Sequence, residues 1–342
     1  SILPNLIVAL VVRLTGWPIE FALNLVATVS ACATGIGVYA IALEVTRDRS
    51  SSVAAALMAS AVAMEGSLWF VWLGVGEYEM FISSAALVFS TLALIRYLKN
   101  RSNVARLLIA VLGLSLTFQS HVWVAMVAAI TAVSMIFSCV RGLWKAFRTL
   151  FLIFLPATLL SSYFYIPLIS YRGTTPLTLE ALSTQFYGVI ERNAVGYLIF
   201  PLTLILLALT RVYKLKIGSP LGRGMLRSFE IVSSLLALHA LMYFVWRFIW
   251  GVEFWDSLHY LTIFLALISG IAIAQIRLKI NDTKSWLRRF ASFAVPVGVI
   301  SIVILSAIPS GTLSFYTVPR ISMRAGYNAP EAELIKPIMQ NV

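Results

Sequence analysis

The stretch Val104–Arg141, VARLLIAVLGLSLTFQSHVWVAMVAAITAVSMIFSCVR, decides how this chain is threaded. It contains two apolar runs, 104–118 and 120–141, and only Gln119-Ser120-His121 divides them. A helix that crosses a bilayer needs about 20 mostly apolar residues, so the two halves are short for two spans. Whether the stretch crosses a membrane once or twice decides on which side every later loop lies.

The rest of the chain has the same apolar character. Hydrophobic residues make up 60% of the composition and charged residues 12%, whereas roughly a quarter of the residues in a soluble domain are charged. We therefore predict an all-α polytopic integral membrane protein with about ten transmembrane helices. The expected spans are about 19–45, 52–72, 78–97, 104–118, 120–141, 146–171, 194–213, 228–249, 257–276 and 291–309.

The bundle at 19–309 is flanked by two outer segments in this interpretation. Residues 1–18 are expected to be the end of an outer loop with an interfacial helix, and residues 310–342 an outer tail. In this tail, Pro330 and Glu331 favour the start of a helix. The tail is expected to be either the beginning of an exterior soluble domain or a plain interfacial segment. Because the first complete span has to run inward, we also expect a further helix and an outer loop before Ser1.

The distribution of charge settles the number of crossings. Positive residues in short loops mark the cytoplasmic side of a membrane protein. With ten spans every second loop is basic, and five such segments hold 19 of the 26 Lys and Arg residues. They contain Arg47 and Arg49; Arg96, Lys99, Arg101 and Arg106; Arg141, Lys145 and Arg148; Arg211, Lys214, Lys216, Arg223 and Arg227; and Arg277, Lys279, Lys284, Arg288 and Arg289. This alternation requires 104–141 to cross twice.

The acidic residues gather on the opposite side. Ten of the 14 lie on or toward it: Glu20, Glu65, Glu77, Glu79, Glu180, Glu191, Glu253, Asp256, Glu331 and Glu333. We predict a multi-pass protein of the plasma membrane whose basic loops are cytoplasmic and whose acidic loops and C-terminal tail are outside. The net charge of +12 then reflects topology, and no nucleic-acid partner is needed to explain it.

Two carboxylates stand between apolar runs in Trp72–Ile82, WLGVGEYEMFI. In an extended loop, residues two apart point the same way, so Glu77 and Glu79 would offer oxygen ligands to one Mg²⁺ or Mn²⁺ ion. The simpler alternative is that both acids stabilise the dipole of the helix that follows.

Two further candidates for substrate binding are Glu65 and His121. Glu65 is expected about 10 Å inside the outer end of its helix, where an ionisable group normally faces the bundle interior or a wet cavity. A protonated Glu65 bonded to a backbone carbonyl is the alternative. His121 is expected at an outer hairpin tip, as a phosphate contact, as a base, or simply as a turn residue.

Four more candidates lie near outer loops. Arg172 and Arg192 flank the longest one, and arginine binds phosphate with two hydrogen bonds, although anchoring to lipid headgroups is the simpler role. His259 lies in the acidic segment GVEFWDSLHY and Arg247 precedes it, and pairing between the acids and the arginine is the simpler role. His239, in contrast, is expected mid-span as a packing residue. The Gly35-x-Gly37 pair is also mid-span and is interpreted as a helix-packing feature.

The order of these features resembles the lipid-linked-sugar glycosyltransferases of the GT-C class. That class includes the archaeal "6-pyruvoyl-tetrahydropterin-synthase-related" membrane proteins and, more distantly, oligosaccharyltransferase catalytic subunits. The similar segments include Leu14-Thr-Gly-Trp-Pro18, Gly74-Val-Gly-Glu-Tyr-Glu-Met80, Ser120-His-Val-Trp123, Ser161-Ser-Tyr-Phe-Tyr-Ile-Pro-Leu168 and Glu331-Ala-Glu-Leu-Ile-Lys336.

The resemblance implies a GT-C-like arrangement of helices. In such enzymes the first outer loop carries an essential acid and a second acidic pair follows the third helix. Glu77 and Glu79 match the second position, and the first acid is not in this sequence. The two glutamates are thus the expected catalytic and metal-binding residues, with Mg²⁺ or Mn²⁺ as the cofactor.

We therefore expect a glycosyltransferase that moves a sugar from a polyprenyl-phosphate-linked donor to an acceptor on the outer face. Membrane lipids, this donor and other membrane subunits are the expected partners. The alternative is a non-catalytic scaffold subunit of a larger membrane complex. A secondary transporter would need paired broken helices in two related halves, and the sequence does not contain them.

Overall fold

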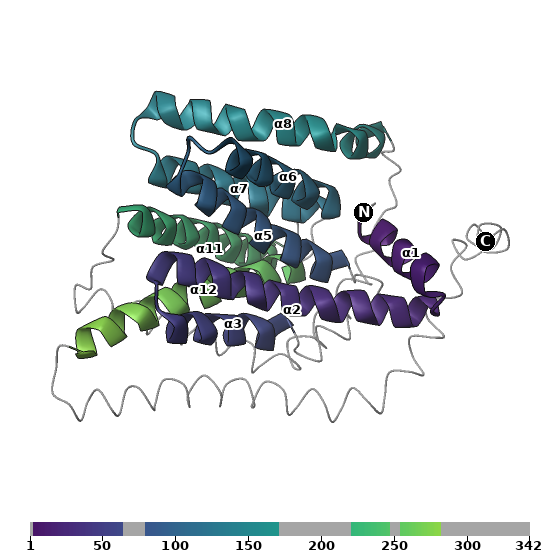
Figure 1. Ribbon diagram of the computed structural model, residues 1–342, viewed down its shortest axis with the longest axis horizontal. Helices are drawn as coiled ribbons and strands as arrows, with labels where there is room; N and C mark the ends of the chain where they lie inside the picture. Colours follow the sequence, from purple (N-terminus) through teal and green to yellow (C-terminus); the bar gives the residue numbers. More distant parts are fainter. Residues whose placement is uncertain (1–2, 64–78, 171–219, 247–253, 282–342) are drawn as a thin grey trace.

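A computed structural model describes residues 3–63, 79–170, 220–246 and 254–281, and these residues form nine α-helices and no strand (Figure 1). The predicted all-helical class is therefore confirmed. The helices are α1 (Leu3–Thr15), α2 (Ile19–Thr46), α3 (Arg49–Ala63), α5 (Glu79–Lys99), α6 (Val104–Ser120), α7 (Val122–Cys139), α8 (Leu143–Ser170), α11 (Pro220–Trp246) and α12 (Phe254–Asn281). The expected spans 194–213 and 291–309, and the end of 52–72, lie outside the described residues.

The stretch 104–141 forms two helices, as the charge pattern required. α6 ends at Ser120, α7 begins at Val122, and His121 between them has an extended backbone with φ −163° and ψ 141°. Since α6 and α7 also contact each other, this stretch is a helical hairpin and not one continuous helix. Asn103 begins the hairpin by accepting a hydrogen bond from the Arg106 backbone N–H at 3.0 Å.

Three of the described helices are long and apolar enough to cross a membrane. They are the segments Phe21–Thr46, Met80–Lys99 and Leu143–Tyr163. Shorter apolar helices run over Pro4–Thr15, Val104–Ser120, Trp123–Cys139 and Tyr260–Ile276. α8 leaves a row of large side chains exposed, including Trp144, Phe147, Phe151, Leu155 and Leu159. Such a continuous apolar face is unusual on a soluble monomer and suits a lipid environment.

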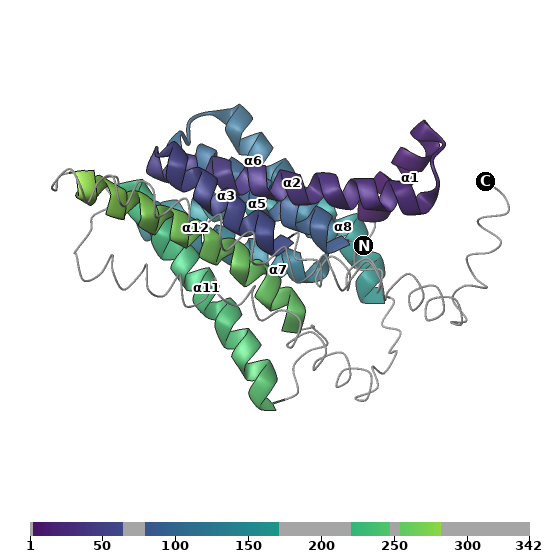
Figure 2. The same cartoon turned by 90° about the horizontal axis from the view of Figure 1, so that it is seen from below.

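Glycines let the helices approach each other closely. A Cβ atom on Gly37 would lie 2.5 Å from Val88 Cγ1 of α5, and one on Gly35 would overlap the Ser60 hydroxyl of α3. The predicted packing role of this glycine pair is confirmed, because α2 uses it to contact both α3 and α5. Figure 2 shows α11 and α12 side by side, running at an angle to α2.

The start of α11 differs from the prediction. The helix begins at Pro220 and not near 228, so Arg223 and Arg227 lie in its first turns and not in a loop. Proline is favoured at the first position of a helix. Gly224 then fits against α7, where a Cβ atom would lie 2.6 Å from the Ser138 carbonyl oxygen. This tertiary contact continues the helix through a glycine-rich, basic segment that has the composition of a loop.

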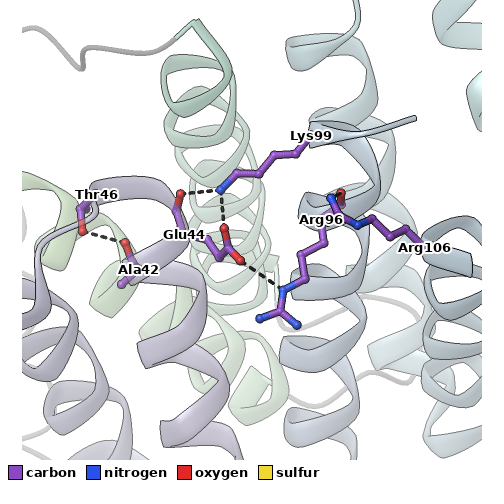
Figure 3. A network of polar contacts seen from close by, with 6 residues as sticks. All are labelled: Ala42, Glu44, Thr46, Arg96, Lys99 and Arg106. Atoms are coloured by element: carbon purple, nitrogen blue, oxygen red, sulfur yellow. Dashed lines mark hydrogen bonds and ion pairs between the residues drawn. The ribbon is translucent and has the colours of Figure 1, made fainter. Parts of the chain in front are cut away.

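The basic turns of the described helices lie at one end of the bundle. Glu44 near the end of α2 forms ion pairs with Arg96, at 3.2 Å, and with Lys99 near the end of α5 (Figure 3). Cys139 at the end of α7 lies 3.8 Å from the Leu221 carbonyl oxygen at the start of α11. The α2–α3, α5–α6 and α7–α8 turns therefore share this end, and the α6–α7 turn lies at the other.

Candidate functional site

The predicted site residues fall into two groups. Five of them, Glu65, Glu77, Arg172, Arg192 and Arg247, lie outside the described residues. The other three are placed along the backbone: Glu79 is the first residue of α5, His121 joins α6 to α7, and His259 is in the second turn of α12. All three positions are at the end of the bundle opposite the basic turns.

A contact between the residues that follow Glu79 and His259 brings these two positions together. The Tyr260 hydroxyl donates a hydrogen bond to the Met80 sulfur at 3.4 Å, and both side chains are buried. Met80 directly follows Glu79, and Tyr260 directly follows His259. The starts of α5 and α12 therefore touch at the candidate site through this side-chain contact.

His121 lies at the same end, half-buried between two helices. Its carbonyl oxygen accepts the Ala125 N–H at 3.0 Å, which is the first backbone hydrogen bond of α7. Two residues after His121, Trp123 packs against α11, where its ring centroid is 4.8 Å from that of His239. The structure thus places His239 as a packing residue, as the sequence predicted.

A polar network joins α6 to α8 beside the hairpin turn. Gln119 donates to Ser115 Oγ at 3.0 Å and to the Leu160 carbonyl oxygen at 3.3 Å, and it accepts a hydrogen bond from the Tyr163 hydroxyl. The hydroxyl oxygens of Ser115 and Ser161 are 3.1 Å apart and form a hydrogen bond. Buried polar groups are costly unless they are hydrogen-bonded, so this network fixes the Gln119 amide within an apolar bundle.

The pairing of Gln119 with Tyr163 was not predicted from the sequence. Gln119 belongs to the Gln-Ser-His break and Tyr163 to the segment Ser161–Leu168. They are 44 residues apart, and no spacing rule connects positions on different helices at that distance. The Gln119 amide could have indicated such a pair, because a glutamine within an apolar bundle needs a hydrogen-bond partner.

The chemistry that this end of the bundle offers is hydrogen bonding by imidazole, amide and phenol groups. The part of the chain that the structure describes contains no group of three His, Cys, Asp or Glu residues placed to hold a metal ion. Glu79 begins α5, where a carboxylate stabilises a helix dipole, and Glu77 lies outside the described residues. The metal site at Glu77 and Glu79 therefore stays a prediction.

Comparisons with protein-family models, curated proteins and solved structures find no match for this chain.

Proposed function

We propose that this chain is a membrane-embedded glycosyltransferase of the GT-C type with about ten spans. It transfers a sugar from a polyprenyl-phosphate-linked donor to an acceptor at the outer face of the plasma membrane. One observation supports this proposal more than any other. The Met80–Tyr260 contact joins the start of α5, with Glu79, to the start of α12, with His259, at the end of the bundle opposite the basic turns.

The roles of the residues follow from the charges of the reaction. The acceptor oxygen forms a bond to the anomeric carbon, the bond from that carbon to the lipid phosphate breaks, and the phosphate leaves with the bonding electrons. A carboxylate of Glu77 or Glu79 takes the acceptor proton. A bound Mg²⁺ or Mn²⁺ would neutralise charge on the leaving phosphate. The donors proposed to bind the phosphate are Arg172, Arg192, Arg247, His121 and His259. We propose Glu65 as a further substrate-binding residue.

Substitution of the two glutamates tests the proposal. Glu77→Gln and Glu79→Gln, in membranes supplied with a labelled lipid-linked donor, are expected to lower transfer at least about 100-fold, the usual minimum for loss of general base catalysis. Glu44→Gln is the matched control, because it makes the same change at the opposite end of the bundle. Transfer at the wild-type rate in both glutamate variants would remove this site from consideration.

The scaffold alternative draws on the exposed face of α8. Trp144 on that face is 82% exposed and Phe151 is 64% exposed, which leaves room for a partner helix as well as for lipid. Purification in mild detergent separates the two functions. A stoichiometric partner in a preparation that transfers no sugar would favour the scaffold, and transfer by the isolated chain would exclude it.

A further inference from the structure

A long apolar groove lies between α1, α5 and α6. Its volume is about 570 Å³, and its walls include Ile7, Ile82, Phe89, Ile109 and Leu116. Ile82 and Arg96 lie 14 residues apart on α5, which at about 1.5 Å per residue gives the groove a length of about 21 Å. Leu116 and Ile109 on α6 are each about half exposed, so the groove opens toward the surroundings of the bundle.

The groove ends at two arginines. Arg96 and Arg106 both line it, and both belong to the basic end of the bundle. Arg106 Nη1 donates to the Arg96 carbonyl oxygen at 3.1 Å, which holds the two residues side by side (Figure 3). An apolar channel that ends at two arginines is complementary to a lipid, which has a hydrocarbon chain and an anionic head.

Positive charge is in excess among the charged residues at this end of the groove. Glu44 is the carboxylate that pairs with Arg96 and Lys99, whereas Arg96, Lys99 and Arg106 carry three positive charges. Arg96 contacts Glu44 through Nε, its side chain is 54% exposed, and its two terminal nitrogens make no hydrogen bond with the described residues. These nitrogens can bind a phosphate with two parallel hydrogen bonds.

We propose that the groove binds a chain of an anionic membrane phospholipid and that Arg96 and Arg106 bind its phosphate. Basic pockets between helices on the cytoplasmic side of a membrane are suited to anionic headgroups. The inference rests on the membrane location of the bundle and not on sugar transfer. The proposed sugar donor would bind at the other end, near Glu79 and His121.

A lipid matches the groove better than a partner helix does, because the groove ends at Arg96 and Arg106. A partner helix would have to present an acid at that end to match the arginines, whereas an anionic phospholipid carries its phosphate at the end of its chains. A hydrocarbon chain needs only the van der Waals width of its methylene groups, about 4 Å.

Native mass spectrometry of the full chain in mild detergent tests the proposal. The probes are dioleoyl phosphatidylglycerol and dioleoyl phosphatidylcholine, which have identical chains and different headgroup charge. The wild type is expected to retain one phosphatidylglycerol with at least about tenfold preference. Arg106→Gln and the double change Arg96→Gln/Arg106→Gln should lower that affinity about tenfold or more, the loss expected for one charged hydrogen bond.

Three further variants separate a lipid site from a structural role. Arg148→Gln removes a positive charge from the same end but away from the groove and should leave the affinity unchanged. Glu44→Gln should raise it, because Arg96 loses its carboxylate partner. Ala86→Trp fills the groove and should lower retention of both lipids, whereas Leu155→Trp on the exposed face of α8 should not.

Several results would overturn the inference. Equal retention of the two phospholipids, or unchanged retention by a folded Arg96→Gln/Arg106→Gln variant, would remove the headgroup site. Retention of a polyprenyl phosphate in place of phosphatidylglycerol would assign the groove to the donor lipid. A second copy or a protein partner in the groove would also contradict it. Each readout is independent of sugar transfer, so a failure of the proposed activity would leave these results interpretable.

Discussion

Gly270 is the position at which a single methyl group gives the sharpest test of the helix packing. It lies in α12 against α3, and a Cβ atom there would be 2.6 Å from Ala55 Cβ and 3.1 Å from the Ser51 carbonyl oxygen. Ordinary contact begins at 3.4 Å, so Gly270→Ala must push the two helices apart by about 0.8 Å. Both neighbouring atoms are rigid, and no side-chain rotation relieves the overlap.

The expected cost follows from two opposing effects. Overpacking of a close contact costs about 1–3 kcal/mol. Alanine is more favourable than glycine in a helix by about 0.8–1.0 kcal/mol, so Gly270→Ala should destabilise by about 1 kcal/mol. Gly35→Ala makes the same change on α2, but its closest neighbour is the Ser60 hydroxyl, which can rotate away. The difference between the two variants therefore reports the steric cost alone.

Exchange of the two residues provides the decisive comparison. In Gly270→Ala/Ala55→Gly the methyl group moves from α3 to α12, so the closest contact disappears and the number of helical alanines is unchanged. Reversible unfolding in mixed micelles, followed by tryptophan fluorescence, should show coupling of about 1–2 kcal/mol between the two changes. Additive effects, or equal stability of Gly270→Ala and Gly35→Ala, would refute the close packing of α3 and α12.

Three other outcomes are expected. Tyr163→Phe removes the hydrogen bond to the buried Gln119 amide and should lower the free energy of unfolding by about 1–2 kcal/mol, whereas Ser162→Ala, an exposed hydroxyl bonded within its own helix, should change it little. Arg47 caps α2 with a left-handed backbone, φ 59°, so Arg47→Gly should raise the melting temperature and Arg47→Val should lower it. In a background without Cys32 and Cys139, a cysteine at Ser102 should react with impermeant reagent from the cytoplasmic side and one at His121 from the other, and labelling from one side would refute the predicted topology.

The sequence predicted the hairpin at 104–141 because two independent signals agreed there. The polar trio Gln119-Ser120-His121 interrupts the apolar run, and the alternation of basic loops requires an even number of crossings. The start of α11 was predicted eight residues too late, because Gly222, Gly224 and Arg223 have the composition of a loop. The helix continues through them since Gly224 packs on the α7 backbone, and such a tertiary contact leaves no trace in one sequence.

Polar pairs between residues far apart in the chain could not be predicted from the sequence either. Glu44 has its partners 52 and 55 residues away, and nothing near it in the chain distinguishes it from an unpaired acid. The same is true of Tyr163 and Gln119. In contrast, the positions of Glu79, His121 and His259 at one end of the bundle follow directly from the predicted order of spans. Topology can be predicted from charge and hydropathy, whereas partner choice requires the packed structure.

The charges at the proposed transfer site lead to one more prediction. A lipid phosphate is an anion, and it must approach Glu77 and Glu79, which are also anionic. Two charges of like sign repel by about 4 kcal/mol at 4 Å near a protein surface, so binding requires a cation between them or beside them. We expect chelation by EDTA to abolish transfer and Mg²⁺ or Mn²⁺ to restore it. Full transfer in EDTA would mean that the carboxylates bind no metal and that Arg172, Arg192 or Arg247 neutralises the phosphate. In that case Glu77→Gln should strengthen donor binding, because it removes the repulsion, whereas in the metal-dependent case it should weaken binding.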